Sequence, residues 1–274
     1  INKLGRGSDF DPLHDDFTYE DYLNGKAYVS GRPLNSFFSY EFTGLSPEDG
    51  RPTFARVEED LWDQYIDMPN SKVFTTVMQY SGCRVPYLQG GISNTFEYNN
   101  FILSFNLAYS IGSKIRLLKL YDNVSAGSSV PQPIKNMRKE FVRRWKRPGD
   151  EKKTNIPGIL NATDFNNSIN YPWWKNEPFS FAANIWQMYD FSNIRVVSGN
   201  YLKLKTLSLR YVMPQKICRK LHVKNMYVSL SGTNLLTWSA KELRGQDPTS
   251  QSGSADRINL SVRPTYSFSL DVSF

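Results

Sequence analysis

The residue types that usually carry catalysis are sparse in this sequence and form no catalytic arrangement. The two histidines, His14 and His222, each lie outside any recognisable catalytic motif. The chain contains neither a Gly-x-Ser-x-Gly nucleophile elbow nor a His-Glu-x-x-His zinc motif. The sequence therefore predicts a protein that is not an enzyme and that carries no cofactor.

Carboxylates and thiols give equally little sign of a metal site. Four aspartates crowd the first part of the chain without the glycine turn of a calcium loop, namely Asp9, Asp11, Asp15 and Asp16. The two cysteines, Cys83 and Cys218, do not have the spacing of a zinc site. We expect no bound metal and two unpaired thiols.

Aromatic side chains are the remaining candidates for contact with a ligand, and they make up 14% of the chain. The candidates that we select lie in the longest irregular stretch, residues 112–199; they are Trp173, Trp174, Trp186 and Tyr189. Exposed aromatic rings stack on sugars and on peptide side chains, so these four are the predicted substrate contacts. The competing interpretation is that the rings pack this stretch against its neighbours.

Basic side chains are concentrated in residues 138–153, in a chain whose formal net charge is +7. Residues 134–146 predict a basic amphipathic helix, because Met137, Phe141 and Trp145 recur at every fourth residue. Such a helix either meets lipid phosphates or presents a solvated face. No recognised nucleic-acid-binding module accompanies the charge, so we expect no nucleic-acid partner.

The clearest secondary-structure pattern among the elements that would position these residues lies at the C-terminal end of the sequence. Apolar and polar residues alternate strictly there, which predicts a β-strand with one apolar and one wet face. The apolar members are Tyr266, Phe268, Leu270, Val272 and Phe274. The strand is about as long as one that crosses a bilayer at a tilt, and its outer aromatics are placed like the girdle of an outer-membrane barrel. A strand of a soluble β-sandwich alternates in the same way.

Earlier segments predict further strands. Residues 88–98 and 101–111 alternate on either side of Asn99 and Asn100, a short-turn signal because asparagine tolerates positive φ. Other predicted strands are 38–42, 201–212 and 226–236; residues 214–221 predict a connector with a helical turn, and 44–86, 112–199 and 239–256 predict loops. The short connections fall at one end of the strands and the long ones at the other, as in outer-membrane barrels.

This arrangement predicts which side chains face lipid and which strand edges are paired. The predicted lipid-facing residues are Leu103, Phe105, Leu107, Leu207, Leu209, Phe268, Leu270 and Val272. The final strand should have one partner within this chain, residues 226–236, because consecutive strands pair in up-and-down barrels. The competing picture is a small self-closed barrel of about eight strands.

Several short segments of the chain carry a more specific signal. Two cover long predicted strands, residues 200–214 (NYLKLKTLSLRYVMP) and residues 228–239 (VSLSGTNLLTWS). The others are residues 144–150 (RWKRPGD), 154–157 (TNIP), 34–38 (LNSFF) and 90–96 (GGISNTF). As an ordered set, these segments resemble the SusC/RagA-type TonB-dependent outer-membrane transporters, and the resemblance runs from about residue 30 to the end of the chain.

The resemblance implies an all-β fold, an antiparallel transmembrane β-barrel segment with long extracellular loops. Residues 1–274 would be the C-terminal portion of a 22-stranded barrel, with the plug domain absent from this chain. The implied function is active import of oligosaccharides or peptides across the bacterial outer membrane. The implied partners are a SusD-like surface lipoprotein, the TonB complex acting through the missing plug segment, the remainder of the same barrel and outer-membrane lipid. A passive porin, or a surface-binding barrel without energy coupling, is the alternative.

Overall fold

The computed structural model of the 274-residue chain describes residues 17–55, 68, 70–121, 129–134, 137–160, 185–249 and 263–274. They form two compact units. Unit 1 is drawn mainly from Ile1–Val85 and Lys114–Val197, and unit 2 from Pro86–Ser113, Ser198–Ser250 and Asn259–Phe274. Among the described residues, no helix has the length and apolar character needed to cross a membrane.

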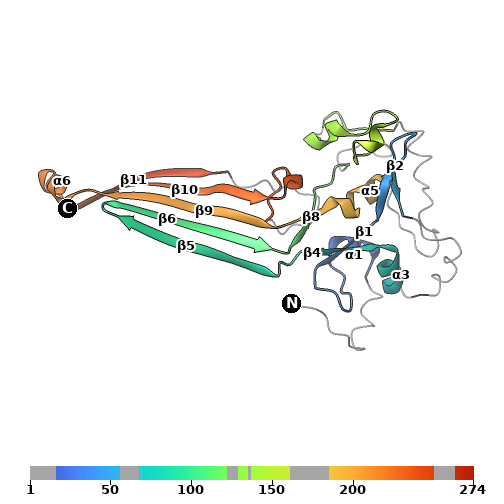
Figure 1. Ribbon diagram of the computed structural model, residues 1–274, viewed down its shortest axis with the longest axis horizontal. Coiled ribbons are helices and arrows are strands. Elements are labelled where there is room, and N and C mark those ends of the chain that lie inside the picture. Colours follow the sequence, from blue (N-terminus) through green and yellow to red (C-terminus); the bar gives the residue numbers. More distant parts are fainter. Residues whose placement is uncertain are drawn as a thin grey trace. The chain divides into compact units, whose positions relative to one another are not determined.

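Unit 2 is one antiparallel sheet of five long strands in the order β11-β10-β9-β6-β5 (Figure 1). The strands are β5 (Leu88–Tyr98), β6 (Phe101–Ile111), β9 (Tyr201–Val212), β10 (Asn225–Ser239) and β11 (Thr265–Ser273). A short helix, α6 (Gln215–Lys220), connects β9 to β10, and the 3-10 turn η6 (Lys241–Leu243) follows β10. All five strands and the α6 connector are confirmed where the sequence predicted them, and β10 extends beyond its predicted end.

The tight turn between β5 and β6 also follows the sequence. Asn99 has a φ of 52°, a left-handed conformation that asparagine adopts more readily than most residues. The Asn100 side chain donates from Nδ2 to the carbonyl oxygen of Val212 at 2.7 Å, and the Val212 N–H donates to the Asn100 carbonyl oxygen at 2.8 Å. The second asparagine therefore links the hairpin to β9, a contact between residues far apart in the sequence.

The sheet does not close on itself within the described residues. The final strand β11 pairs with β10 alone, and β5 pairs with β6 alone. The prediction of a single partner for the last strand is confirmed, and the picture of a self-closed barrel of about eight strands is wrong for the described part of the chain.

Unit 1 is made of short elements joined by irregular segments. Its helices are α1 (Tyr19–Asn24), α3 (Asn70–Val77) and α5 (Ile185–Asp190), with 3-10 turns η3 (Lys139–Arg143), η4 (Asp150–Lys152) and η5 (Asn193–Arg195). Its two-stranded ribbons pair β1 (Ser36–Ser39) with β4 (Gln79–Cys83), β2 (Phe42–Leu45) with β3 (Pro52–Phe54), and β7 (Lys114–Arg116) with β8 (Val196–Ser198). Residues 44–86 were predicted as a long loop with a short helix-like run around residues 58–65. That run lies outside the described residues, and the described part of the stretch forms β3, α3 and β4 instead of a loop.

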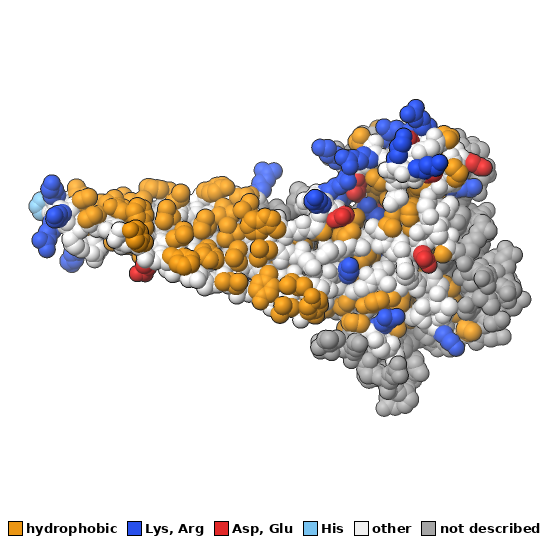
Figure 2. All heavy atoms as spheres, in the orientation of Figure 1, with side chains coloured by type: hydrophobic (Ala, Val, Ile, Leu, Met, Phe, Trp, Pro, Cys, Tyr) orange, Lys and Arg blue, Asp and Glu red, His pale blue; other side chains and the backbone are white. Residues whose placement is uncertain are grey.

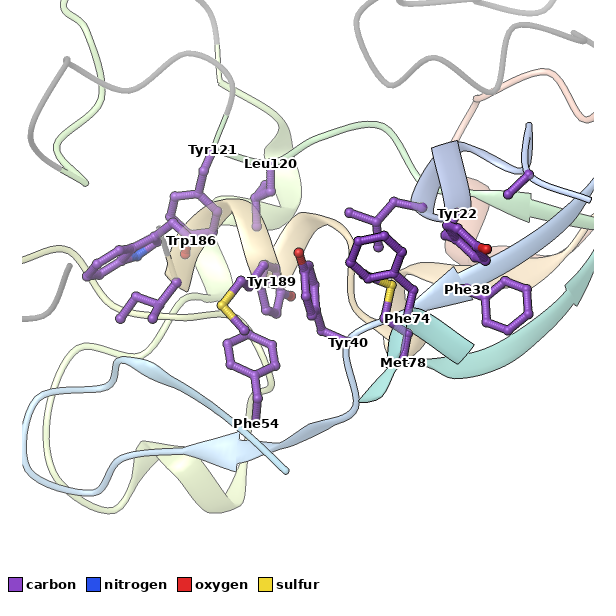
Figure 3. Close-up of a cluster of buried hydrophobic side chains, with 14 of the residues drawn as sticks. Tyr22, Phe38, Tyr40, Phe54, Phe74, Met78, Leu120, Tyr121, Trp186 and Tyr189 are labelled. Carbon is purple, nitrogen blue, oxygen red and sulfur yellow. The ribbon is translucent and has the colours of Figure 1, made fainter. Parts of the chain in front are cut away.

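An aromatic cluster forms the core of unit 1 (Figure 3). Tyr22 of α1 contacts Phe38 of β1 edge-on and Phe74 of α3 at a tilt, with ring centroids 5.6 and 5.3 Å apart. Tyr40 and Tyr189 are almost completely buried in the same cluster. Hydrophobic burial of these large rings stabilises short elements that would not persist alone.

Two local predictions in unit 1 are wrong because tertiary packing overrides the local pattern. Residues 38–42 do not form one strand: β1 ends at Ser39, and Tyr40 bridges to Ser192 before β2 begins. The predicted helix over 134–146 is reduced to η3 among its described residues. Trp145 leaves helical geometry to pack its ring over Gly50, where an added Cβ would lie 2.3 Å from the ring.

Candidate functional site

The five-stranded sheet of unit 2 has one apolar face (Figure 2). One row of directly paired residues crosses all five strands on this face: Phe268, Leu230, Leu209, Leu103 and Phe96. The next row toward the Asn99 turn is Leu270, Val228, Tyr211, Phe101 and Tyr98. The row on the other side is, in strand order, Tyr266, Gly232, Leu207, Phe105 and Asn94, so three of its five residues are apolar or aromatic.

The predicted lipid-facing residues all lie on this one face. A bulge at Lys205 shifts the alternation of β9 by one residue, so the apolar face carries odd-numbered residues from Leu207 to Tyr211 and even-numbered residues from Leu202 to Leu204. Beyond it, Leu107 therefore pairs with Leu204, and Leu204 with Leu236, still on the apolar face. Residues of β5 and β10 on this face, such as Ile92 and Leu230, were not among the predicted lipid-facing residues, although both strands alternate between apolar and polar residues.

The apolar face is open to its surroundings. Phe268 is 71% exposed, Leu230 56% and Phe96 55%, so even the row that crosses the sheet's middle strands is not covered. Soluble monomers rarely expose contiguous apolar patches of more than a few hundred Å². An apolar surface that continues over five strands is typical of contact with lipid or with another protein.

Aromatic residues at the ends of the apolar face give the tilt of the strands. Between terminal aromatic residues, the face covers Phe101 to Tyr109 on β6 and Tyr266 to Phe274 on β11, two stretches of equal length, and Ile111 extends it on β6. The register places Phe101, the end of the face on β6, level with Leu270 of β11. The corresponding end on β11 is Phe274, so the apolar face of β11 is displaced along the strand by the distance from Leu270 to Phe274. That displacement is about 13 Å, over a lateral distance of about 14 Å from β6 to β11. If the aromatic ends of the apolar face on β6 and β11 lie at the same depth in a membrane, the strands must be tilted by about 40°, as in outer-membrane barrels.

The opposite face of the sheet is polar. Its central row consists of small hydroxyl side chains, Ser267, Ser231, Ser208, Ser104 and Thr95. Neighbouring strands share side-chain hydrogen bonds on this face: Thr95 with Ser104 at 3.1 Å, and Asn106 Nδ2 to Thr206 Oγ1 at 2.7 Å. A surface of hydroxyls and amides offers donors and acceptors to water or to a polar solute.

The segment that follows β10 covers part of the polar face. Lys203 on β9 and Asp247 in this segment form an ion pair, and Leu243 of η6 is 1% exposed. Asp247 also accepts hydrogen bonds from the N–H and hydroxyl of Thr249 at 2.8 and 2.7 Å. We call residues 240–249 the strap. Sequence reasoning missed it because no local pattern links Lys203 to Asp247.

The predicted substrate-contact residues have different outcomes. Trp173 and Trp174 lie outside the described residues, so their prediction stays open. Trp186 and Tyr189 lie on α5 and are 1% and 2% exposed. Trp186 donates from Nε1 to the Gly158 carbonyl oxygen at 3.4 Å, and Tyr189 packs edge-on against Tyr121. The premise that these two rings are exposed is wrong, because α5 forms part of the core (Figure 3).

Unit 1 also buries charged groups, and each of them is engaged within the fold. The Asp190 carboxylate accepts the N–H groups of Leu120 at 2.8 Å and Tyr121 at 3.0 Å. Burial raises the pKa of Asp190 to about 6, although Arg195 and the two N–H groups act in the opposite direction. Arg195 pairs with Glu140 at 3.3 Å.

Arg116 is a second buried charge of unit 1. Its Nη2 donates to the carbonyl oxygens of Leu23 and Phe38, both at 3.0 Å, and so connects α1 to β1. Burial lowers the pKa of Arg116 to about 9. These buried charges connect segments of the core, and the described residues contain no cluster of His, Cys, Asp and Glu side chains that could hold a metal.

The remaining candidate residues have simple placements. Asp9, Asp11, Asp15, Asp16 and His14 lie outside the described residues, whereas His222 is exposed just after α6. Cys83 and Cys218 are free and buried. In the basic run, Arg138 pairs with Glu140 at 2.9 Å, whereas Lys139, Arg143, Lys146 and Arg147 are exposed.

Comparisons with known proteins agree with this architecture. No protein-family model matches the chain. The TonB-dependent receptor P3 of Formosa agariphila is 22% identical over 254 residues, which cover 90% of this chain and 22% of that protein. The chain thus spans about a fifth of the length of the curated relative it matches.

Solved structures of RagAB share the fold. The RagAB peptide transporter superposes with a TM-score of 0.57 and 19% identity, over 92% of this chain and 24% of that chain. The RagAB peptide importer in its "closed-closed" state gives a TM-score of 0.53 and 18% identity, over 90% of this chain and 23% of that chain. The resemblance seen in the sequence is confirmed: the chain is similar to the SusC/RagA-type TonB-dependent transporters.

Proposed function

We propose that this chain forms part of the barrel wall of an outer-membrane transporter that imports nutrients actively. The observation that carries the proposal is the exposed apolar face of unit 2, which continues over five strands and is backed by a polar face. Backbone hydrogen bonding within the sheet allows such strands to lie in lipid. The tilt of about 40° that levels the aromatic ends supports the same conclusion.

In this proposal the two open edges of the sheet are completed by other strands of a larger barrel. An edge left unpaired in lipid would expose a row of N–H and C=O groups, each costing several kcal/mol. Residues 1–274 would be the C-terminal portion of a 22-stranded barrel, and a plug domain would belong to another part of the protein. The polar face would line the lumen, where hydroxyl and amide groups favour water and polar solutes.

The partners follow from the family that the chain resembles. The TonB complex would supply energy through the plug, and a SusD-like surface lipoprotein would cap the lumen. The similar solved structures are those of a peptide transporter or importer, RagAB. For this protein the substrate class is oligosaccharides or peptides, and Trp173 and Trp174 are the proposed aromatic contacts.

The proposal is tested with the complete protein in an outer-membrane host. Fractionation should place it in the outer membrane, with heat-modifiable migration on gels as expected of a folded barrel. Uptake of labelled oligosaccharide and peptide mixtures is then compared in cells with and without TonB. Uptake that requires TonB supports active import. Equal uptake without TonB would support the passive porin instead, and a protein recovered in the soluble fraction would contradict both.

A further inference from the structure

A compact group of basic side chains lies at the end of the sheet near the Asn99 turn. The connector from β9 to β10 contains Lys216, Arg219 and Lys220 on α6, followed by His222 and Lys224. Residues 214–224 contain no acidic residue. We call these five side chains the connector cluster.

The connector cluster is exposed and unneutralised. All five of its side chains are exposed. No carboxylate forms an ion pair with any of them among the residues that the structure describes; the acidic side chains on neighbouring strands, Glu97 and Asp271, lie on the polar face. The cluster therefore presents a concentrated positive charge to whatever lies beside it.

Apolar side chains accompany the charge. Ile217 and Leu221 are four residues apart on the connector and are 42% and 54% exposed. Cys218 between them is fully buried and anchors the helix. An acidic soluble partner would need the charges alone, whereas lysine and arginine beside exposed aliphatic side chains are typical of a segment at a membrane surface.

The cluster continues from the apolar face. The strand before the connector contributes Tyr211 to the aromatic end of that face, and Met213 donates its N–H to Met226 of β10 at 2.9 Å. Lys224 donates its N–H to Ser273 of β11 at 2.7 Å, next to Phe274. Figure 2 shows the basic side chains at this tip of the sheet, directly beyond the apolar side chains. In a bilayer this position is the level of the lipid phosphates.

We propose that the connector cluster binds the phosphates of anionic phospholipids in the periplasmic leaflet, with Ile217 and Leu221 inserted between the headgroups. The inference rests on the proposed function, because it requires the sheet to span the membrane with its short connections on the periplasmic side. It assigns a role to a segment that the proposed import function leaves unused. Basic side chains near an anionic leaflet each favour binding about fivefold, and salt weakens this preference.

The test uses the complete transporter in nanodiscs of phosphatidylcholine with increasing phosphatidylglycerol. Native mass spectrometry measures which lipids stay bound. The wild-type protein should retain phosphatidylglycerol preferentially, and less so at high salt. The variant K216Q/R219Q/K220Q/K224Q should lose at least about tenfold of that preference. The control K139Q/R143Q/K152Q/K153Q removes the same number of exposed basic residues from unit 1 and should retain it.

A second variant separates lipid from an acidic protein as the partner. I217S/L221S keeps every charge, so it should preserve the preference for phosphatidylglycerol while retaining less of both lipids. The inference would be overturned if I217S/L221S retained as much lipid as the wild-type protein. It would also be overturned if the wild-type protein and K216Q/R219Q/K220Q/K224Q showed the same preference for phosphatidylglycerol, or if only the unit 1 control lost that preference. Failure to enter neutral phosphatidylcholine bilayers would instead defeat the proposed function, so the two failures are distinguishable.

Discussion

Lys203 on β9 and Asp247 in the strap form an ion pair with 3.6 Å between Nζ and Oδ2, and each side chain is 8% exposed. One residue lies on a strand and the other in a connection far along the chain, yet together they hold residues 240–249 against the polar face of the sheet. Removing a single partner of such a pair leaves a buried, uncompensated charge, which costs more than the pair itself contributes.

Replacing one member of this pair should release the strap. Asp247→Asn should weaken the attachment by about 3–5 kcal/mol, because the Lys203 charge then has no counter-ion. Trypsin cleavage after Lys241 and Arg244 in the folded protein measures the release and should accelerate by about two orders of magnitude. Lys203→Met combined with Asp247→Asn should recover most of the protection. Lys205→Met, at an exposed position of the same strand, is the control and should leave cleavage unchanged.

A charge in the middle of the apolar face should be costly. Leu270 lies halfway between Tyr266 and Phe274, so Leu270→Arg should destabilise the folded protein in a bilayer by about 2–4 kcal/mol. Urea titration of the reconstituted protein measures the change in free energy of unfolding. Ser269→Arg places the same side chain on the opposite, polar face and should cost much less. Equal effects of the two variants would show that the apolar face does not contact lipid.

The outer edge of β11 should be hydrogen-bonded in the complete protein. Ser273 accepts a bond from Lys224 through its carbonyl, so by strand alternation the N–H groups of Phe268 and Leu270 point away from β10. If another strand pairs with this edge, these amides should exchange with solvent deuterium as slowly as those of Ser269 and Asp271. Fast exchange of Phe268 and Leu270 beside slow exchange of their neighbours would mean that the edge is open.

The stability of unit 1 around Asp190 should depend on pH. Its carboxyl has a pKa of about 6 in the fold, above the ordinary value of 3.8 for an aspartate, so between these two values the folded state holds a proton that the unfolded state has released. This contribution to stability is therefore complete below about pH 4 and is lost as the pH rises through 6, by up to about 1.4 kcal/mol per pH unit.

Amide exchange of Leu120 and Tyr121, whose N–H groups bind Asp190, measures this dependence after correction for intrinsic exchange. Protection should fall from pH 4 to 6 in the wild-type protein. Asp190→Asn should abolish the slope and also lower protection at every pH, since one N–H loses its acceptor. Asp49→Asn, a partly exposed carboxyl elsewhere in unit 1, should retain the slope.

The sequence alone was sufficient for the strands of unit 2. Alternation in β5, β6, β9 and β11 is a local property, and a strand with one apolar and one polar face displays it regardless of its neighbours. The Asn99 turn was predictable for the same reason, because its positive φ depends on the residue itself. The residues on the apolar face of β11 could therefore be predicted from the sequence alone.

Tertiary structure decided the features that depend on distant residues. Trp186 and Tyr189 become core side chains through contacts with segments such as Gly158 and Tyr121, and Trp145 is removed from a predicted helix by packing on Gly50. Register between β6 and β9 sets the displacement of the aromatic ends from which the tilt of about 40° is inferred, and a long-range ion pair joins Asp247 to Lys203. Periodicity reports only which face of its own strand or helix a residue occupies. The element that meets that face depends on long-range packing energies, which no local pattern encodes.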